Sequence, residues 1–218
     1  PFPVDSMRNS INDRAVGSVS NIAAALKEFK KTAYHHYGSR PSSIIRFLYY
    51  SALRVNTFWL TGTELTDGLP SMHMDACYRV IKPTLEELDR LRKGLDLPRE
   101  FYYDRILGLK TCYLAFKDGE LAYIHWIITQ GDYSRFLVLP ADAVELNYNT
   151  TLRPFRGNKL MAKMLCQTFR DLKENGLRRV FSIAHEGNQP SLDAMQDAGF
   201  RKLRTIRAIG PFNRKVRV

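Results

Sequence analysis

Residues 144–200 constrain the fold more than any other part of the chain, because their pattern alternates between strand and helix. Residues 144–152 are rich in Asn, Thr and Tyr and end shortly before Pro154, as a short β-strand does. From Leu160 the apolar residues recur three and four positions apart, which is the stripe of an amphipathic helix. The sequence therefore predicts a strand, a short turn and a helix in direct succession.

The alternation continues beyond this helix. Gly176 stands where a glycine commonly ends a helix. Residues 178–184 are mainly β-branched or aromatic, so they predict a second strand. A second helix is then expected to begin near Ser191 and to end at Gly199.

The turn Arg156-Gly157-Asn158, which joins the first strand to the first helix, is a candidate anion site. A helix N-terminus leaves about four N–H groups without an acceptor and carries a partial positive charge. When a strand runs straight into a helix through a short turn, these donors converge on one spot. An anion such as a pyrophosphate can bind there.

The turn resembles that of the GCN5-related N-acetyltransferase (GNAT) superfamily. The family's turn begins with Gln or Arg and has small residues at its fourth and sixth positions, and its backbone amides hold the pyrophosphate of acyl-CoA. Arg156 takes the first position, and Gly157 fits the common Arg-Gly start. Lys159 and Met161 stand where the two later small residues usually are, so the motif is degenerate.

The second helix carries a closer match. Asn188, Ser191, Gly199 and Phe200 have the spacing usual in the helix that flanks the pantetheine arm of the cofactor in this family. The resemblance covers about residues 76–218. It implies that acetyl-CoA or another acyl-CoA is the acyl donor and that no metal is needed. The residues it implies for binding the donor are Thr151, Leu152, Arg156, Gly157, Asn158, Lys159, Leu160, Met161, Asn188 and Ser191.

Glu145 is the candidate general base that makes the attacking amine neutral. It lies on the strand eleven residues before Arg156, where some GNAT enzymes have a glutamate. A shift of one residue along a strand would turn the side chain to the other face. Asp142 is therefore an alternative base, and so is a water held by Asn147 and Asn149.

A general acid would protonate the leaving thiolate. In the family this is commonly a tyrosine seven residues after the asparagine of the second helix, and here that position is Met195. Tyr148 or Tyr123 could take the role from the strands, or the thiolate could leave without an acid.

The sequence predicts two parts, an α-helical N-terminal extension over residues 1–75 and a GNAT-like domain over 76–218. Helices are expected over 21–35 and from Pro41, the latter with an apolar arc that runs to Phe58. The boundary is placed at the Gly68-Leu69-Pro70 break.

In the second part the patterns predict an α+β fold with a central, mostly antiparallel mixed sheet flanked by helices. The expected elements are a strand over 77–81, a helix with a Thr84–Glu87 capping box, a short helix within 97–109, a hairpin around Asp118-Gly119, and a closing antiparallel pair of strands over 202–209 and 212–218.

The net charge of +11 favours anionic partners. An acyl carrier protein fits this charge, whereas nucleic acid is unlikely because no nucleic-acid-binding motif is present. Residues 41–60 could dock on the main domain, contact a membrane surface or pair with a second chain. Three widely spaced cysteines form no metal or disulfide pattern, and a reducing cytoplasm is the simplest compartment.

Three functions remain open at this stage. The first is an acyl-CoA-dependent N-acyltransferase that acts on a small amine. The second is a long-chain N-acyl amino acid synthase-like enzyme that uses acyl carrier protein. The third is a catalytically silent binding module.

Overall fold

The computed structural model describes residues 30, 40–48, 55–209 and 216–218. The chain divides into two compact units, residues 1–49 and 50–218. In the first unit helix α2, Ser42–Leu48, begins directly after Pro41, as the sequence predicted. The helix expected over 21–35 lies outside the described residues except for Lys30.

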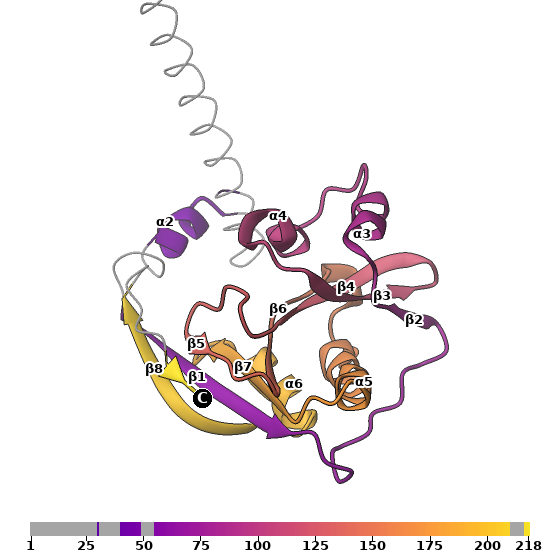
Figure 1. Cartoon of the computed structure of the whole chain (residues 1–218). Coiled ribbons are helices and arrows are strands. Elements are labelled where there is room, and N and C mark those ends of the chain that lie inside the picture. Colours follow the sequence, from indigo (N-terminus) through magenta and orange to yellow (C-terminus); the bar gives the residue numbers. More distant parts are fainter. Residues whose placement is uncertain (1–29, 31–39, 49–54, 210–215) are drawn as a thin grey trace, which may run out of the picture. The chain divides into compact units, whose positions relative to one another are not determined.

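The second unit is built on a seven-stranded sheet with the order β2-β3-β4-β6-β7-β1-β8 (Figure 1). Every neighbouring pair is antiparallel except β6 and β7, which are parallel. The strands are β1 (Val55–Glu64), β2 (Tyr78–Ile81), β3 (Thr111–Lys117), β4 (Glu120–Ile128), β6 (Ala143–Thr151), β7 (Arg179–His185) and β8 (Arg201–Ile209). The prediction of an α+β fold with a mostly antiparallel mixed sheet is therefore confirmed.

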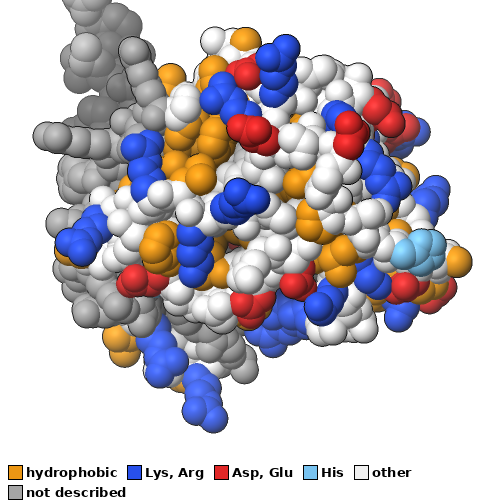
Figure 2. All heavy atoms as spheres, turned by 90° about the horizontal axis from the view of Figure 1, so that it is seen from below, with side chains coloured by type: hydrophobic (Ala, Val, Ile, Leu, Met, Phe, Trp, Pro, Cys, Tyr) orange, Lys and Arg blue, Asp and Glu red, His pale blue; other side chains and the backbone are white. Residues whose placement is uncertain are grey.

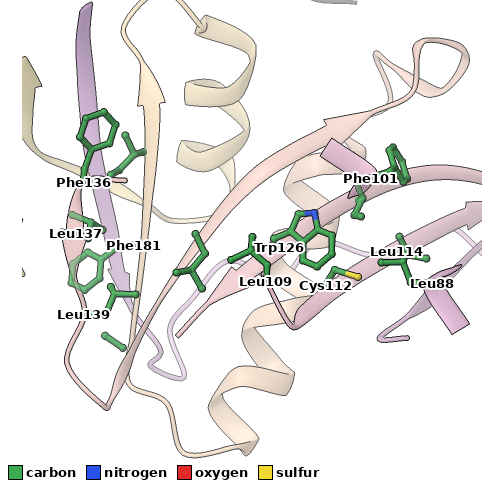
Figure 3. Packing of buried hydrophobic residues seen from close by; sticks show 14 of the residues in the cluster. Leu88, Phe101, Leu109, Cys112, Leu114, Trp126, Phe136, Leu137, Leu139 and Phe181 are labelled. Atoms are coloured by element: carbon green, nitrogen blue, oxygen red, sulfur yellow. The ribbon is translucent and has the colours of Figure 1, made fainter. Parts of the chain in front are cut away.

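Helices cover both faces of this sheet. The long helix α5 (Leu160–Glu174) and helix α6 (Gln189–Asp197) bury their apolar sides on one face, which we call the α5 face. Helix α3 (Leu85–Leu91), the 3₁₀ turn η2 (Arg99–Tyr102) and the short helix α4 (Tyr103–Leu107) contribute to the core on the opposite face, the α4 face. In Figure 3 the labelled side chains of the α4-face core form two groups, one around Phe136 and Phe181 and one around Trp126 and Leu114.

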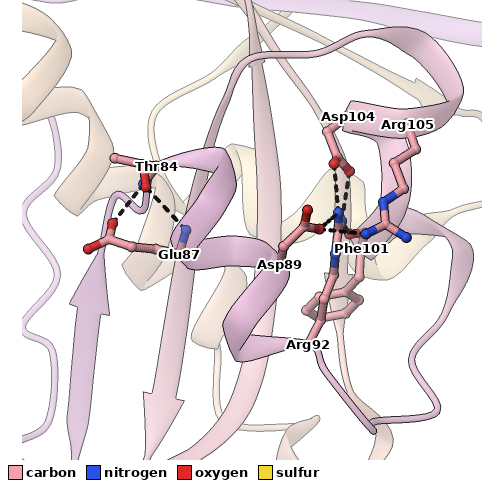
Figure 4. Close-up of polar contacts among 7 residues, drawn as sticks. All are labelled: Thr84, Glu87, Asp89, Arg92, Phe101, Asp104 and Arg105. Carbon is pink, nitrogen blue, oxygen red and sulfur yellow. Dashed lines mark hydrogen bonds and ion pairs between the residues drawn. The ribbon is translucent and has the colours of Figure 1, made fainter.

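Local sequence signals explain several of these elements. Thr84 and Glu87 form both bonds of the predicted capping box at the start of α3 (Figure 4). Asp118 and Gly119 have positive φ in the turn between β3 and β4, as the predicted hairpin requires. Helix α5 spans the predicted residues, and its cap is followed by Gly176 with φ of +80°.

The predicted domain boundary after residue 75 is wrong, because it leaves strand β1 outside the domain that contains the sheet. Residues 55–64 do not continue the apolar helix but lie between β7 and β8, with Phe58 opposite His185 on one side and Ile206 on the other. Only 1% of Leu60 is exposed. The amphipathic segment expected over 41–60 is thus strand at its C-terminal end, and the sheet domain begins before the predicted boundary.

The prediction that residues 202–209 and 212–218 form an antiparallel pair is also wrong. Strand β8 pairs with β1, and β9 (Val216–Arg217) pairs in parallel with the short strand β5 (Leu137–Val138). Strand β1 lies beside β8, where residues 212–218 were expected. The physical reason is that β1 is the more apolar partner and can be buried between two strands.

Arg92, at the end of α3, ties the α4-face helices together (Figure 4). Its guanidinium is 3% exposed and donates to the Phe101 carbonyl oxygen and to both carboxylate oxygens of Asp104, at 2.7 Å each. It also contacts Asp89 and lies 4.9 Å from the centre of the Tyr102 ring. A buried charge with these partners fixes α3 against η2 and α4.

None of the helices within the described residues is long and apolar enough to cross a membrane. Lysine and arginine side chains are spread over the face seen in Figure 2, with acidic side chains among them, in keeping with the net charge of +11.

Candidate active site

Strands β6 and β7 separate soon after they begin. They pair only between Ala143 and Glu145 on β6 and between Arg179 and Phe181 on β7. Beyond these residues, among the described strands, β6 pairs only with β4 and β7 only with β1. We call this divergence the split. Within the described residues it leaves one edge of each strand without a strand partner.

A β-bulge lies on the β6 side of the split. Between the pairs Trp126–Asn147 and Ile124–Thr150, the single residue His125 of β4 opposes Tyr148 and Asn149 of β6. Tyr148 has a φ of +55°, which is uncommon for a residue with a side chain. Its amide donates to the side-chain oxygen of Asn147, which holds the bulge in this conformation.

The N-terminus of α5 presents unpaired donors at the end of the same strand. Within the described part of the chain, the backbone amides of residues 157–162 have no hydrogen-bond acceptor, and Lys159 forms no side-chain cap. Gly157 has a φ of +86° and Lys159 one of +52°, so the chain turns sharply into the helix. This geometry is that of an anion site.

The side chains at the two unusual motif positions have other contacts. The Lys159 ammonium lies 3.0 Å from an Asp197 carboxylate oxygen on α6. Met161 is half-buried and packs against the α5-face core. The side chains of Arg156 and Asn158 bond back to carbonyl oxygens, at Thr151 (3.0 Å) and Phe155 (3.5 Å) respectively.

The other predicted donor-binding residues lie at the ends of the strands beside the split. Thr151 ends β6, and the Leu152 amide donates to Ala122 on β4. Asn188 is exposed and precedes α6, where its carbonyl accepts the Ser191 amide. Leu160 is buried as the first residue of α5. The structure therefore gathers the predicted set around one end of the sheet.

Glu145 lies at the last paired position of β6, where the split opens. Its side chain is 1% exposed, and its two oxygens accept from the Ser134 hydroxyl (2.5 Å) and the Asn147 amide (2.7 Å). Burial raises its pKa, an effect that the two hydrogen bonds partly oppose. A carboxylate has about four lone-pair sites, so Glu145 keeps capacity for further donors.

Tyr148 lies on the α4 face, with its ring centre 4.3 Å from that of Tyr103 on α4. Burial raises the pKa of Tyr148, and nearby Glu145 raises it further. Burial likewise raises the pKa of Tyr103 to about 12. Both phenols are therefore protonated donors at neutral pH.

Two of the alternative residues lie elsewhere. Tyr123 is fully buried on the α5 face, where its hydroxyl lies 3.2 Å from His125 Nδ1, and His125 Nε2 lies 3.1 Å from the Thr168 hydroxyl of α5. Asp142 precedes β6 at the end away from the turn, and one of its carboxylate oxygens lies 2.7 Å from Arg179. Tyr123, named as a possible acid, therefore lies in the α5-face core, and Asp142, named as an alternative base, lies at the end of β6 away from the turn.

Met195, at the position of the family's usual acid, is buried in the α5-face core. Its sulfur lies 3.5 Å from the hydroxyl of Thr61 on β1. A thioether has no proton to donate, so Met195 serves only as a buried packing residue of α6.

Arg135 and Ser134, which precede β5, were not predicted from the sequence. Ser134 binds Glu145, and the Arg135 guanidinium lies 4.7 Å from the Phe136 ring centre and 5.4 Å from that of Phe58. These residues come from a segment without periodicity. The only sequence signal for a site here was an arginine close to aromatic residues, and this pattern is also common on ordinary protein surfaces.

A cavity of about 880 Å³ lies away from the split, at the C-terminal end of β1 and the N-terminal ends of β7 and β8. Gly62, Glu64, Arg179, Phe181, Gln196 and Leu203 are among its lining residues, and none of the predicted site residues is. Backbone donors at a helix end need no enclosed cavity, so we place the candidate site at the split. Among the described residues, no three His, Cys, Asp or Glu side chains gather closely enough to hold a metal ion.

No protein-family profile and no curated protein matches the sequence. Solved structures do match. A GCN5-related N-acetyltransferase from Sphaerobacter thermophilus is 14% identical with a TM-score of 0.50, over 75% of this chain and 54% of that one. The chain has the GNAT fold.

Two further solved structures also match the chain. A Drosophila protein is 10% identical with a TM-score of 0.52, over 76% of this chain and 54% of that one. A GCN5-related glucosamine N-acetyltransferase region of a fungal multi-domain GH3 β-N-acetylglucosaminidase is 13% identical with a TM-score of 0.51, over 77% and 23%. The chain thus spans about half the length of the first two proteins.

Proposed function

We propose that this protein is an N-acyltransferase that moves an acyl group, acetyl in the simplest case, from acyl-CoA to the amine of a small molecule. The observation that supports it most is the position of the split. The unpaired amides of residues 157–162 lie beside it, so one ligand can bind the helix end with its phosphates and reach between β6 and β7 with its thioester.

Two buried acceptors suit the amide groups of such a ligand. Among the residues that the structure describes, the side-chain oxygen of Asn149, in the bulge, has no hydrogen-bond partner, and neither has the hydroxyl of Ser182 on β7. Ser182 follows the last residue of β7 that pairs with β6, so it lies beside the split. Buried polar atoms are usually satisfied, and a bound ligand would satisfy these two.

The reaction requires one proton to leave the amine and one to reach the thiolate. In the proposed mechanism the amine nitrogen attacks the thioester carbon, so that a C–N bond forms and the C–S bond breaks. Glu145 takes the amine proton, directly or through a water held by Asn147, and burial, which raises its pKa, makes it a stronger base than an exposed glutamate. Tyr148 donates a proton to the departing thiolate.

A thermal-shift experiment tests donor binding. Acetyl-CoA should raise the melting temperature, because a ligand at 100 times its Kd stabilises the native state by about 2.7 kcal/mol. A shift that grows with acyl-chain length would favour the alternative of long-chain transfer. If neither acyl-CoAs nor free CoA gives a shift, the proposed function is wrong.

Gly157→Ala should weaken this shift, because alanine strains the positive φ that aims the helix-end amides. Gly119→Ala is the matched control. Both glycines have φ near +87° and open space at the Cβ position, but Gly119 lies in the β3–β4 hairpin. Both variants should lose about 1 kcal/mol of stability, and only Gly157→Ala should bind CoA less tightly.

Glu145→Gln tests the base. We expect kcat to fall by about 100-fold or more, and the acid limb of the pH–rate profile to disappear. In the wild type this limb should lie above the usual glutamate range, because burial raises the pKa of Glu145 and the base must be deprotonated. Glu120→Gln, an exposed glutamate at the start of β4, is the control. Unchanged turnover in Glu145→Gln would remove this residue from the mechanism.

A further inference from the structure

We propose that Tyr103 is a positioning residue for the acyl transfer, because its ring packs on Tyr148 and holds that side chain beside the split. Tyr103 is the first residue of α4, and its ring centre lies 4.3 Å from that of Tyr148. The inference rests on the proposed function, in which Tyr148 protonates the departing thiolate. It goes beyond that function by adding a residue of the α4 face that acts through another side chain.

The side chain of Tyr148 needs support from outside its own strand. Tyr148 lies in the β-bulge of β6 and has a φ of +55°, a conformation that residues with a side chain rarely adopt. The bond from its amide to the Asn147 side chain (2.8 Å) fixes the backbone but not the ring. Within the described part of the chain, the Tyr148 hydroxyl forms no hydrogen bond, and the aromatic ring that contacts this side chain is that of Tyr103.

Tyr103 is held in place by residues on both sides of it in the sequence. The next residue, Asp104, accepts two hydrogen bonds of 2.7 Å from the buried guanidinium of Arg92 (Figure 4). Before Tyr103, the carbonyl oxygen of Glu100 in η2 accepts the indole N–H of Trp126 on β4, also at 2.7 Å. Charge-assisted bonds such as the first pair are roughly twice as strong as neutral ones. The start of α4 therefore has little freedom to move.

These contacts close a loop that begins and ends at the bulge. The ring contact joins Tyr148 to Tyr103, and η2 joins Tyr103 to Glu100. The indole of Trp126, bonded to η2, then leads back to Asn147, its pairing partner on β6 and the residue before Tyr148. Since Trp126 is 0% exposed, breaking its bond would leave a buried donor unsatisfied. The ring of Tyr103 is therefore fixed relative to the strand that carries Tyr148.

Proton transfer is sensitive to small displacements of this kind. A general acid must come within about 2.6–3.2 Å of the atom that takes its proton, and a misplacement of about 1 Å costs roughly 100-fold in rate. Burial is the main reason that the pKa of Tyr148 is raised, and the phenol of Tyr103 adds to this effect. Loss of the Tyr103 ring should therefore both free the Tyr148 side chain and lower its pKa.

The test substitutes Tyr103 in the full-length protein and measures thiol release from acetyl-CoA, with glycine, putrescine and tyramine as probe amines. Tyr103→Phe keeps the ring and should leave kcat within about twofold of the wild type. Tyr103→Ala removes the ring, so kcat should fall by about 10-fold or more while KM for acetyl-CoA stays the same. The alkaline limb of its pH–rate profile should move to lower pH, because that limb follows loss of the proton from Tyr148.

A double-mutant cycle separates positioning from a general structural role. If Tyr103 acts through Tyr148, Tyr103→Ala should lower kcat by less than about twofold in the Tyr148→Phe background. The matched control is Tyr102→Ala. The Tyr102 ring is also partly buried on the α4 face, but it lies 4.9 Å from the Arg92 guanidinium. Its loss should lower the melting temperature and leave both kcat and the alkaline limb unchanged.

A measurement without substrate checks the ring contact itself. Tetranitromethane nitrates accessible tyrosines, so peptide mass spectrometry should find Tyr148 modified faster in Tyr103→Ala than in the wild type. An unchanged nitration rate overturns the inference. So does a Tyr103→Ala variant with the wild-type kcat and alkaline limb, or one that loses as much activity without Tyr148 as with it.

Equal losses in Tyr103→Phe and Tyr103→Ala would also overturn the inference, because the hydroxyl and not the ring would then be needed. The melting-temperature shift with acetyl-CoA should persist in every variant. Its absence in the wild type would instead be a failure of the proposed function, so the two failures are distinguishable.

Discussion

A fragment of residues 76–218, which starts at the domain boundary suggested by the sequence, is expected not to fold. The fragment lacks β1, which lies between β7 and β8 in the sheet. Without β1, strand β8 loses its sheet neighbour and β7 exposes an unpaired edge. The buried side chain of Leu60 and the bond from the Thr61 hydroxyl to the Ser182 carbonyl oxygen (3.0 Å) are lost as well.

The matched fragment is residues 50–218, which keeps the whole second compact unit. We expect it to unfold cooperatively on heating, with a near-ultraviolet circular dichroism signal that is lost in a single step. The 76–218 fragment should show no such transition and should aggregate. If it unfolded cooperatively within a few degrees of the longer fragment, β1 would not be an essential strand of this sheet.

Arg92→Ala is expected to have the second largest effect. The substitution leaves the Asp104 carboxylate, which is 9% exposed, and the Phe101 carbonyl oxygen without their guanidinium partner. Removing one partner of a buried ion pair typically costs about 3–5 kcal/mol. Because a domain has a total stability of about 5–15 kcal/mol, much of the protein should then be close to unfolding.

Arg105→Ala is the control for this substitution. Arg105 contacts Asp89, as Arg92 does, but it is 60% exposed, so its loss should cost less than about 1 kcal/mol. Chemical denaturation of both variants gives the difference in free energy of unfolding. Equal effects of the two substitutions would show that the burial of Arg92 has no special role.

The parts of the fold that the sequence predicted well carry strong local signals. Helix α5 has a clear apolar stripe and a glycine after its end, and the β3–β4 hairpin has Asp-Gly at its turn. Strand β1 lacked such a signal. Its Phe58-Trp59-Leu60 run packs against the cores on both faces of the sheet and shows no alternation, so it could not be told from the end of a helix.

The candidate site was predictable only where it depends on the backbone. The turn at Gly157 follows from a strand that runs into a helix, and the structure shows it. Tyr123 could not be placed, because its contact with His125 depends on Thr168 from a helix 43 residues further along the chain. Arg135 lies in an irregular segment, where only the tertiary structure brings it to the Phe58 ring of β1.

The position of β1 has a consequence for how the protein is made. This strand is among the first described residues to leave the ribosome, yet its partners β7 and β8 are among the last. Thr61 and Ser182, which bond across β1 and β7, are 121 residues apart. An apolar strand is therefore synthesised well before both of its neighbours, and pairing between residues so far apart in the sequence is expected to slow folding.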